Sequence, residues 1–229
     1  MWIFLSAASA LVLGVYDLSK KSAVAGNPVL PTLFTTTLSG AACTLPFILL
    51  SALHPQLAER IHVFIPSQPA AMHLLILAKS LIVGISWALS YAALKHLPIT
   101  VASPLRATAP LFTVVGAVVL FGERPGALQW AGIILILAAY LGYSLPSRHG
   151  GSQASRGWIV VMLLAALTGS LSAGFDKYLL QTRGLPALFV LGWFLPYLAA
   201  MLATALLASR FLRRGTAAPF RLRPTLLLV

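Results

Sequence analysis

Long apolar stretches separated by short polar segments run along the whole chain. Each is roughly twenty residues long, the length that an α-helix needs to cross about 30 Å of hydrocarbon. The stretches are too continuous for the apolar–polar alternation of an outer-membrane β-barrel. The pattern therefore predicts an all-α integral membrane protein, a bundle of about seven transmembrane helices. The expected spans cover residues 2–18, 31–53, 72–94, 99–121, 127–145, 157–180 and 185–209.

Two polar linkers interrupt this pattern. Residues 54–71 contain Glu59, Arg60 and three prolines, and residues 146–156 are rich in glycine, serine and arginine. Such compositions are typical of connections between structural units. The second linker is the expected hinge between a first unit of five spans, residues 1–145, and a second unit, residues 157–229.

The two units repeat one another weakly but in register. Asp17 and Asp176 are the matched positions, and an aromatic residue precedes each of them. Small residues stand at equal offsets before the two acids, namely Ser6, Ala10 and Gly14 in the first unit and Ala165, Gly169 and Ala173 in the second. The motif Leu-Pro-x-Leu-Phe follows at residues 30–34 and again at 185–189. Internal repeats of this kind are typical of secondary transporters, and an odd number of spans per unit would invert the second unit.

Composition and charge agree with a membrane setting. Hydrophobic residues make up 59% of the chain and charged residues 9%, and the mean hydropathy is +0.91, unlike soluble domains. The net charge of +12 arises mainly from short loops, so it indicates topology and lipid contact, and we expect no nucleic-acid partner. The loop at residues 210–224 holds five arginines. Because lysines and arginines are enriched in cytoplasmic loops, the distribution of these residues over all loops favours an N-terminus outside the cell.

Residues suited to metal, redox or enzymatic chemistry are few. The one cysteine, Cys43, lies within an apolar stretch, and the five histidines lie in or beside loops without the spacing of a metal site. No span contains a nucleophile beside a base or a cluster of carboxylates, and there is no phosphate-binding loop. We therefore expect no enzyme activity, no cofactor and no bound metal.

A more specific pattern lies at the junction of the third, fourth and fifth spans. It comprises residues 91–104, Ala109-Pro110-Leu111-Phe112-Thr113, Gly122-Glu123-Arg124 and Gln129-Trp130-Ala131-Gly132. In order and spacing these residues resemble the EamA-type repeat of the drug/metabolite transporter superfamily. The similarity covers residues 1–145 as one full repeat and the remainder as part of a second. Within it, Glu123 is expected to cap the following helix.

This resemblance implies ten helices in two inverted five-helix repeats, alternating access, and transport of small metabolites. It also implies that both termini lie in the cytoplasm, opposite to the orientation that the charge count favours. Residues 225–229 look like the opening of an eighth span, so we expect a fragment of a ten-helix protein. The alternative is a natural seven-helix chain, which would favour a membrane scaffold or assembly partner without transport activity.

Ionisable residues within the spans are the first candidates for a site, because a charge in hydrocarbon costs at least about 2.5 kcal/mol. They are Asp17, Lys79, Arg106 and Asp176. Arg106 lies between Pro104 and Pro110, which can kink the span beside a cavity, and its guanidinium is suited to a carboxylate or phosphate. The alternative for Arg106 is an internal ion pair with Asp17.

The two acids also have two interpretations. As matched positions, Asp17 and Asp176 would be a gate or substrate contacts related by a pseudo-two-fold axis. Alternatively, Asp17 pairs with Lys20 or Lys21 one turn further along its own helix, which contributes a few tenths of a kcal/mol.

The remaining candidates share one face of the third span. Lys79 is a substrate contact, or it extends along its stem to the membrane surface. Trp87 and Tyr91 are four residues apart and either line a cavity for an amphipathic metabolite or serve as packing anchors.

Together these residues predict a secondary transporter of small polar or anionic metabolites, with its site between the repeats. The expected partners are a small-molecule substrate, the lipid bilayer and, as one option, a second copy of the chain in a homodimer. The expected location is a cell membrane crossed several times, the bacterial inner membrane in particular.

Overall fold

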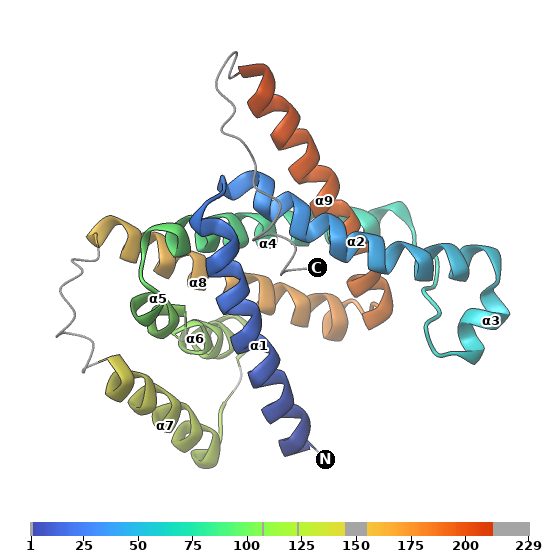
Figure 1. The fold of residues 1–229 in the computed structure, drawn as a ribbon. Coiled ribbons are helices and arrows are strands. Elements are labelled where there is room, and N and C mark those ends of the chain that lie inside the picture. Colours follow the sequence, from blue (N-terminus) through green and yellow to red (C-terminus); the bar gives the residue numbers. More distant parts are fainter. Residues whose placement is uncertain (1, 107, 123, 145–154, 213–229) are drawn as a thin grey trace.

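The computed structural model describes residues 2–106, 108–122, 124–144 and 155–212. Every regular element among these residues is a helix (Figure 1), which confirms the predicted all-α class. The elements are α1 (Trp2–Ala25), α2 (Val29–Leu53), α3 (Pro55–Arg60), α4 (Ala70–His96), α5 (Ile99–Arg106), α6 (Ala109–Phe121), α7 (Ala127–Ser144), α8 (Arg156–Lys177), the π-helical turn η2 (Tyr178–Thr182) and α9 (Ala187–Leu212).

Helices occupy all seven predicted spans. Among the described residues, five segments have the length and hydropathy of a membrane-crossing helix: Val29–Leu53, Ala70–His96, Ile99–Val119, Arg156–Thr182 and Ala187–Ser209. Some boundaries differ from those expected. Helix α1 continues to Ala25, so Lys20 and Lys21 are helical, and α9 includes Arg210, which the hydropathy pattern assigns to a loop. Glu123, most of the predicted hinge and the start of the predicted eighth span lie outside the described residues.

The fourth predicted span holds two helices among the described residues, at the place where Pro104 and Pro110 predict a kink. Helix α5 ends at Arg106 and α6 begins at Ala109. Pro110 lies in the first turn of α6, where the missing N–H of proline has no helical partner in any case. Ser170 of α8 donates a hydrogen bond of 2.8 Å to the Ala109 carbonyl oxygen. Protein therefore covers polar backbone at the interruption, as a membrane interior requires.

Helix α4 is at the centre of the packing. Its most extensive contact is with α8, beside which it lies in Figure 1, and it also contacts α1, α2 and α9. One core cluster joins residues of α1, α2, α4, α5, α8 and α9, and a second joins α4, η2 and α9 around Ile76, Leu179 and Phe189. Helices from before and after residues 146–156 therefore share both cores.

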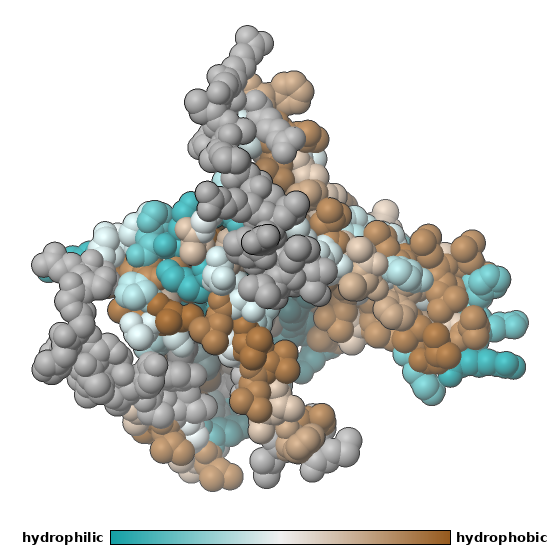
Figure 2. All heavy atoms as spheres, viewed as in Figure 1, coloured by the Kyte–Doolittle hydropathy of each residue, from teal (hydrophilic) through white to brown (hydrophobic). Residues whose placement is uncertain are grey.

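Apolar side chains cover much of the surface. Figure 2 shows hydrophobic residues over α2 and along α1, whereas the end of the molecule at α3 is hydrophilic. Phe4, Leu11, Leu53 and Phe211 are each more than 70% exposed. Soluble monomers seldom expose contiguous apolar surface on this scale, so this surface is suited to lipid contact.

Small residues allow α4 and α8 to approach closely. Ser86 donates a hydrogen bond of 2.8 Å to the Ala165 carbonyl oxygen. A Cβ atom on Gly169 would lie 3.2 Å from the Ser86 Oγ. Small residues at helix interfaces are the usual means of close packing in membranes, and two of the repeated small residues, Ala165 and Gly169, have this role.

We expect Gly169→Val to lower the free energy of unfolding by about 1–3 kcal/mol, because the added methyl groups overpack this contact. Gly116→Val in α6 is the matched control, since nothing lies within 4 Å of the Cβ position at Gly116. Both variants bear the same helix cost of a β-branched residue. Thermal unfolding in detergent checks the difference, and equal Tm values would contradict the close approach.

Candidate functional site

An ion pair joins α1 to the end of α5. Arg106 donates through Nη1 to the Asp17 Oδ1, and the two side chains are 29% and 26% exposed. The alternative in which Asp17 pairs with Lys20 or Lys21 is therefore wrong, because Asp17 binds Arg106, which lies 89 residues further along the chain. The internal pair considered for Arg106 is present. A guanidinium has five N–H donors, so a contact through Nη1 leaves capacity for a second acceptor.

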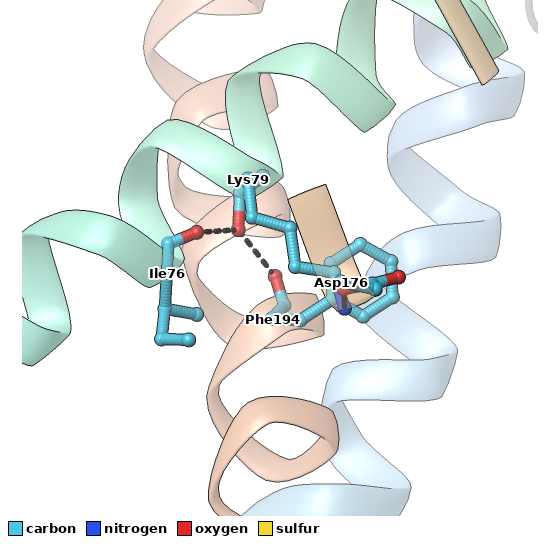
Figure 3. Close-up of polar contacts among 5 residues, drawn as sticks. Ile76, Lys79, Asp176 and Phe194 are labelled. Atoms are coloured by element: carbon cyan, nitrogen blue, oxygen red, sulfur yellow. Dashed lines mark hydrogen bonds and ion pairs between the residues drawn. The ribbon is translucent and has the colours of Figure 1, made fainter. Parts of the chain in front are cut away.

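A second ion pair joins α4 to the end of α8. Lys79 Nζ lies 2.6 Å from the Asp176 Oδ1, with the Lys79 side chain 6% and the Asp176 side chain 35% exposed. Figure 3 shows the Lys79 side chain extending toward Asp176 beside Phe194 of α9, whose ring centre lies 4.9 Å from the ammonium. Ser80 also reaches α9, with its Oγ 3.1 Å from the Phe194 carbonyl oxygen. The Lys79 ammonium thus faces Asp176 and Phe194 and is almost fully buried.

A cavity of about 560 Å³ lies among α1, α4, α5, α6 and α8. This volume is typical of small-molecule sites. Its ionisable lining residues are Asp17, Lys20 and Arg106, so basic groups outnumber acidic groups by one in the described lining. Hydroxyl groups come from Ser86, Ser90 and Ser103, and Gly14, Ala165, Ala166 and Gly169 leave the space open.

An apolar groove continues from this cavity. It has a volume of about 430 Å³, and Ala109, Pro110 and Gly169 line both spaces. Its other lining residues are Thr113, Val114, Ser170 and Ala173. The groove therefore provides room for the apolar part of a bound molecule next to the charged cavity.

Lys20 is the ionisable cavity residue that the sequence did not place in the site. Its distance of three residues from Asp17 suggested a local ion pair. In the structure Lys20 is 4% exposed, and its ammonium lies over the rings of Tyr16, Trp87 and Tyr91. The spacing of Tyr16 and Lys20 on one helical face was visible in the sequence, but their neighbours from α4 were not.

The structure brings together only some of the predicted site residues. Asp17, Trp87 and Arg106 line the cavity. Tyr91 is fully buried and does not line the cavity. Its ring contacts the Lys20 ammonium from the protein interior. Lys79 and Asp176 form their own pair outside the lining. Substrate binding by these residues stays a prediction.

The histidines of α4 contact aromatic side chains. His73 Nδ1 lies 2.8 Å from the Tyr197 hydroxyl oxygen, and His96 stacks on Trp158 with ring centres 3.9 Å apart. Within the described ranges, no group of three or more histidine, cysteine or acidic residues is placed to bind a metal. Cys43 is exposed on α2.

The chain was compared with protein families and with curated proteins. No curated protein matches the chain. The EamA-like transporter family matches residues 1–145, which is more than half of the chain and includes α1 to α7. Together with the helical architecture and the apolar surface, this match places the protein among multi-pass membrane proteins. The chain therefore belongs to the EamA-like transporter family, whose members are membrane transporters.

Proposed function

We propose that this protein transports a small organic anion by alternating access, and that the anion binds in the cavity between Lys20 and Arg106. The observation that supports this most directly is the charge of the cavity. Two basic groups, Lys20 and Arg106, line this space of about 560 Å³ together with one acid, Asp17, so one basic group has no carboxylate partner in the described lining. A carboxylate or phosphate group on the substrate would supply the missing negative charge.

Arg106 is the anchor of the proposed site. Its planar guanidinium can bind a carboxylate or phosphate through two parallel hydrogen bonds. Asp17 holds Arg106 from the α1 side, and this contact restricts the rotamers of a long side chain before the substrate arrives. Asp17 is therefore a positioning residue for Arg106 in the proposed mechanism.

The rest of the cavity accepts the body of the substrate. The Trp87 ring lines it, and hydroxyl groups of Ser86 and Ser90 provide hydrogen bonds one turn apart on α4. The apolar groove next to Pro110 continues the space. These features favour a substrate with a charged end and a partly apolar body.

The two sequence units provide the moving parts. Alternating access requires contacts between packed units that can open and re-form. The Lys79–Asp176 pair joins α4 of the first unit to α8 of the second, and it would act as a lock in the conformation described. The interruption between α5 and α6 lies beside the cavity, where a broken helix allows local movement.

The direct test is uptake into proteoliposomes that contain the purified protein. We expect labelled small mono- and dicarboxylates or organic phosphates to enter, and their amide and amine analogues of the same size to be excluded. Empty liposomes are the control for leakage. Uptake of the amines in preference to the acids would contradict the proposed charge preference.

The same assay separates transport from the alternative role as a membrane scaffold. A folded, inserted protein that moves none of the panel and binds none of it in detergent would favour the scaffold. Binding without uptake would instead retain the anion site and remove the transport step from the proposal.

A further inference from the structure

The Lys20 ammonium occupies a cage of three aromatic rings at the wall of the cavity. Its Nζ lies 4.1 Å from the ring centre of Tyr16 in α1. The ring centres of Tyr91 and Trp87 in α4 lie 5.2 Å and 5.6 Å away. All three distances are within about 6 Å, the range over which a ring face attracts a cation. Because Lys20 is only 4% exposed, the rings replace most of the water around its charge.

The nearby carboxylates are engaged elsewhere. Asp17, one turn before Lys20, is bound by Arg106, and Asp176 is bound by Lys79. Neither Asp17, Glu59 nor Asp176, the acids in the part of the chain that the structure describes, forms an ion pair with Lys20. The ring faces are therefore the main stabilising surroundings of this ammonium.

A cage of aromatic faces is also the arrangement that recognises free quaternary ammonium compounds. In this protein a side chain supplies the cation through a covalent tether. We propose that Lys20 determines the charge selectivity of the cavity. Its ammonium fills an aromatic cage that would otherwise accept an organic cation, and it presents a positive charge to an anion beside Arg106. The second part rests on the proposed anion transport, whereas the first part does not.

Two substitutions of Lys20 separate volume from charge. Lys20→Ala removes both the charge and the side chain that fills the space between the rings, so the cage opens. Lys20→Met removes the charge but keeps an unbranched side chain of similar length in the cage. If occupancy of the cage excludes cations, only the alanine variant gains affinity for them. If simple repulsion by Lys20 excludes cations, both variants gain affinity.

The experiment measures equilibrium binding of radiolabelled tetramethylammonium to the full chain in detergent. We expect Lys20→Ala to bind it about tenfold or more tightly than the unsubstituted protein, since each ring face attracts a desolvated cation. Lys20→Met should show no gain, and Lys20→Ala/Trp87→Ala should lose the gain. Lys95→Ala is the matched control, because Lys95 is exposed on α4 and donates to the Asn27 carbonyl oxygen away from the cage.

Three results would overturn the proposal. They are no gain in a monodisperse Lys20→Ala protein, an equal gain in Lys20→Met, and a gain that persists without Trp87. Lys20→Ser opens the same space and replaces the alanine variant if that variant aggregates. Anion uptake by the unsubstituted protein is measured separately. If Lys20→Ala gains cation binding but the unsubstituted protein binds no anion, the proposed function is refuted and the proposal about the aromatic cage stands. If the unsubstituted protein binds anions but Lys20→Ala gains no cation binding, only the proposal about the cage is refuted.

Discussion

Arg106→Gln should reduce anion binding about 10- to 100-fold, because a hydrogen bond to a charged group contributes about 1.5–3 kcal/mol. Glutamine keeps a polar side chain but lacks the charge and the paired donors of the guanidinium. Binding of a labelled carboxylate that the uptake assay identifies, measured on the detergent-purified chain, gives the affinity. Arg183→Gln is the matched control, since Arg183 is exposed and its Nε donates to the Tyr178 hydroxyl outside the cavity.

A double variant distinguishes an anion anchor from a purely structural ion pair. Asp17→Asn alone should keep or increase anion affinity, because the amide oxygen still accepts from Arg106 and the cavity gains one positive charge. Arg106→Gln/Asp17→Asn should recover thermal stability relative to Arg106→Gln but not anion binding. Recovery of binding in the double variant would show that the pair supports the fold and that Arg106 does not contact the substrate.

Asp176→Asn should destabilise the protein by about 3 kcal/mol, because it leaves a buried ammonium without its carboxylate. Lys79, with 6% of its side chain exposed, cannot regain water without opening the α4–α8 contact. Lys79→Met should be milder, since the Asp176 side chain that remains is 35% exposed as a whole, although its Oδ1 is buried. Thermal unfolding in detergent therefore tests an asymmetry between the two partners of one ion pair.

The control for this pair is Glu59→Gln, the same acid-to-amide change on exposed α3, which we expect to leave the Tm within a degree or so. Lys79→Met/Asp176→Asn removes both charges and should be more stable than Asp176→Asn alone. Equal losses for Asp176→Asn and Lys79→Met would mean that the unequal burial of the two groups has no energetic consequence, and the expected asymmetry would then be wrong.

The positions of the helices follow from the sequence alone to a large extent. An apolar stretch in lipid must satisfy its own backbone hydrogen bonds, so a run of about twenty such residues forms a helix wherever the neighbouring helices lie. The motif at the junction of the third to fifth spans also identified the family before any contact was known. The interruption at Arg106 was only partly predictable. Pro104 and Pro110 suggested a kink, but the hydroxyl that covers the Ala109 carbonyl comes from Ser170, 61 residues further along the chain.

The partners of the charged residues were decided by the tertiary structure. Asp17 has two lysines within about one turn, yet it binds Arg106, which lies 89 residues away in the chain. An exposed local pair contributes only a few tenths of a kcal/mol, whereas leaving a partly buried guanidinium unpaired costs several times more. The Lys20 ammonium, which has no carboxylate partner among the described residues, lies over the Trp87 and Tyr91 rings of α4. Sequence spacing fixes which side chains share a helical face, but packing fixes which charges lose water, and that loss selects their partners.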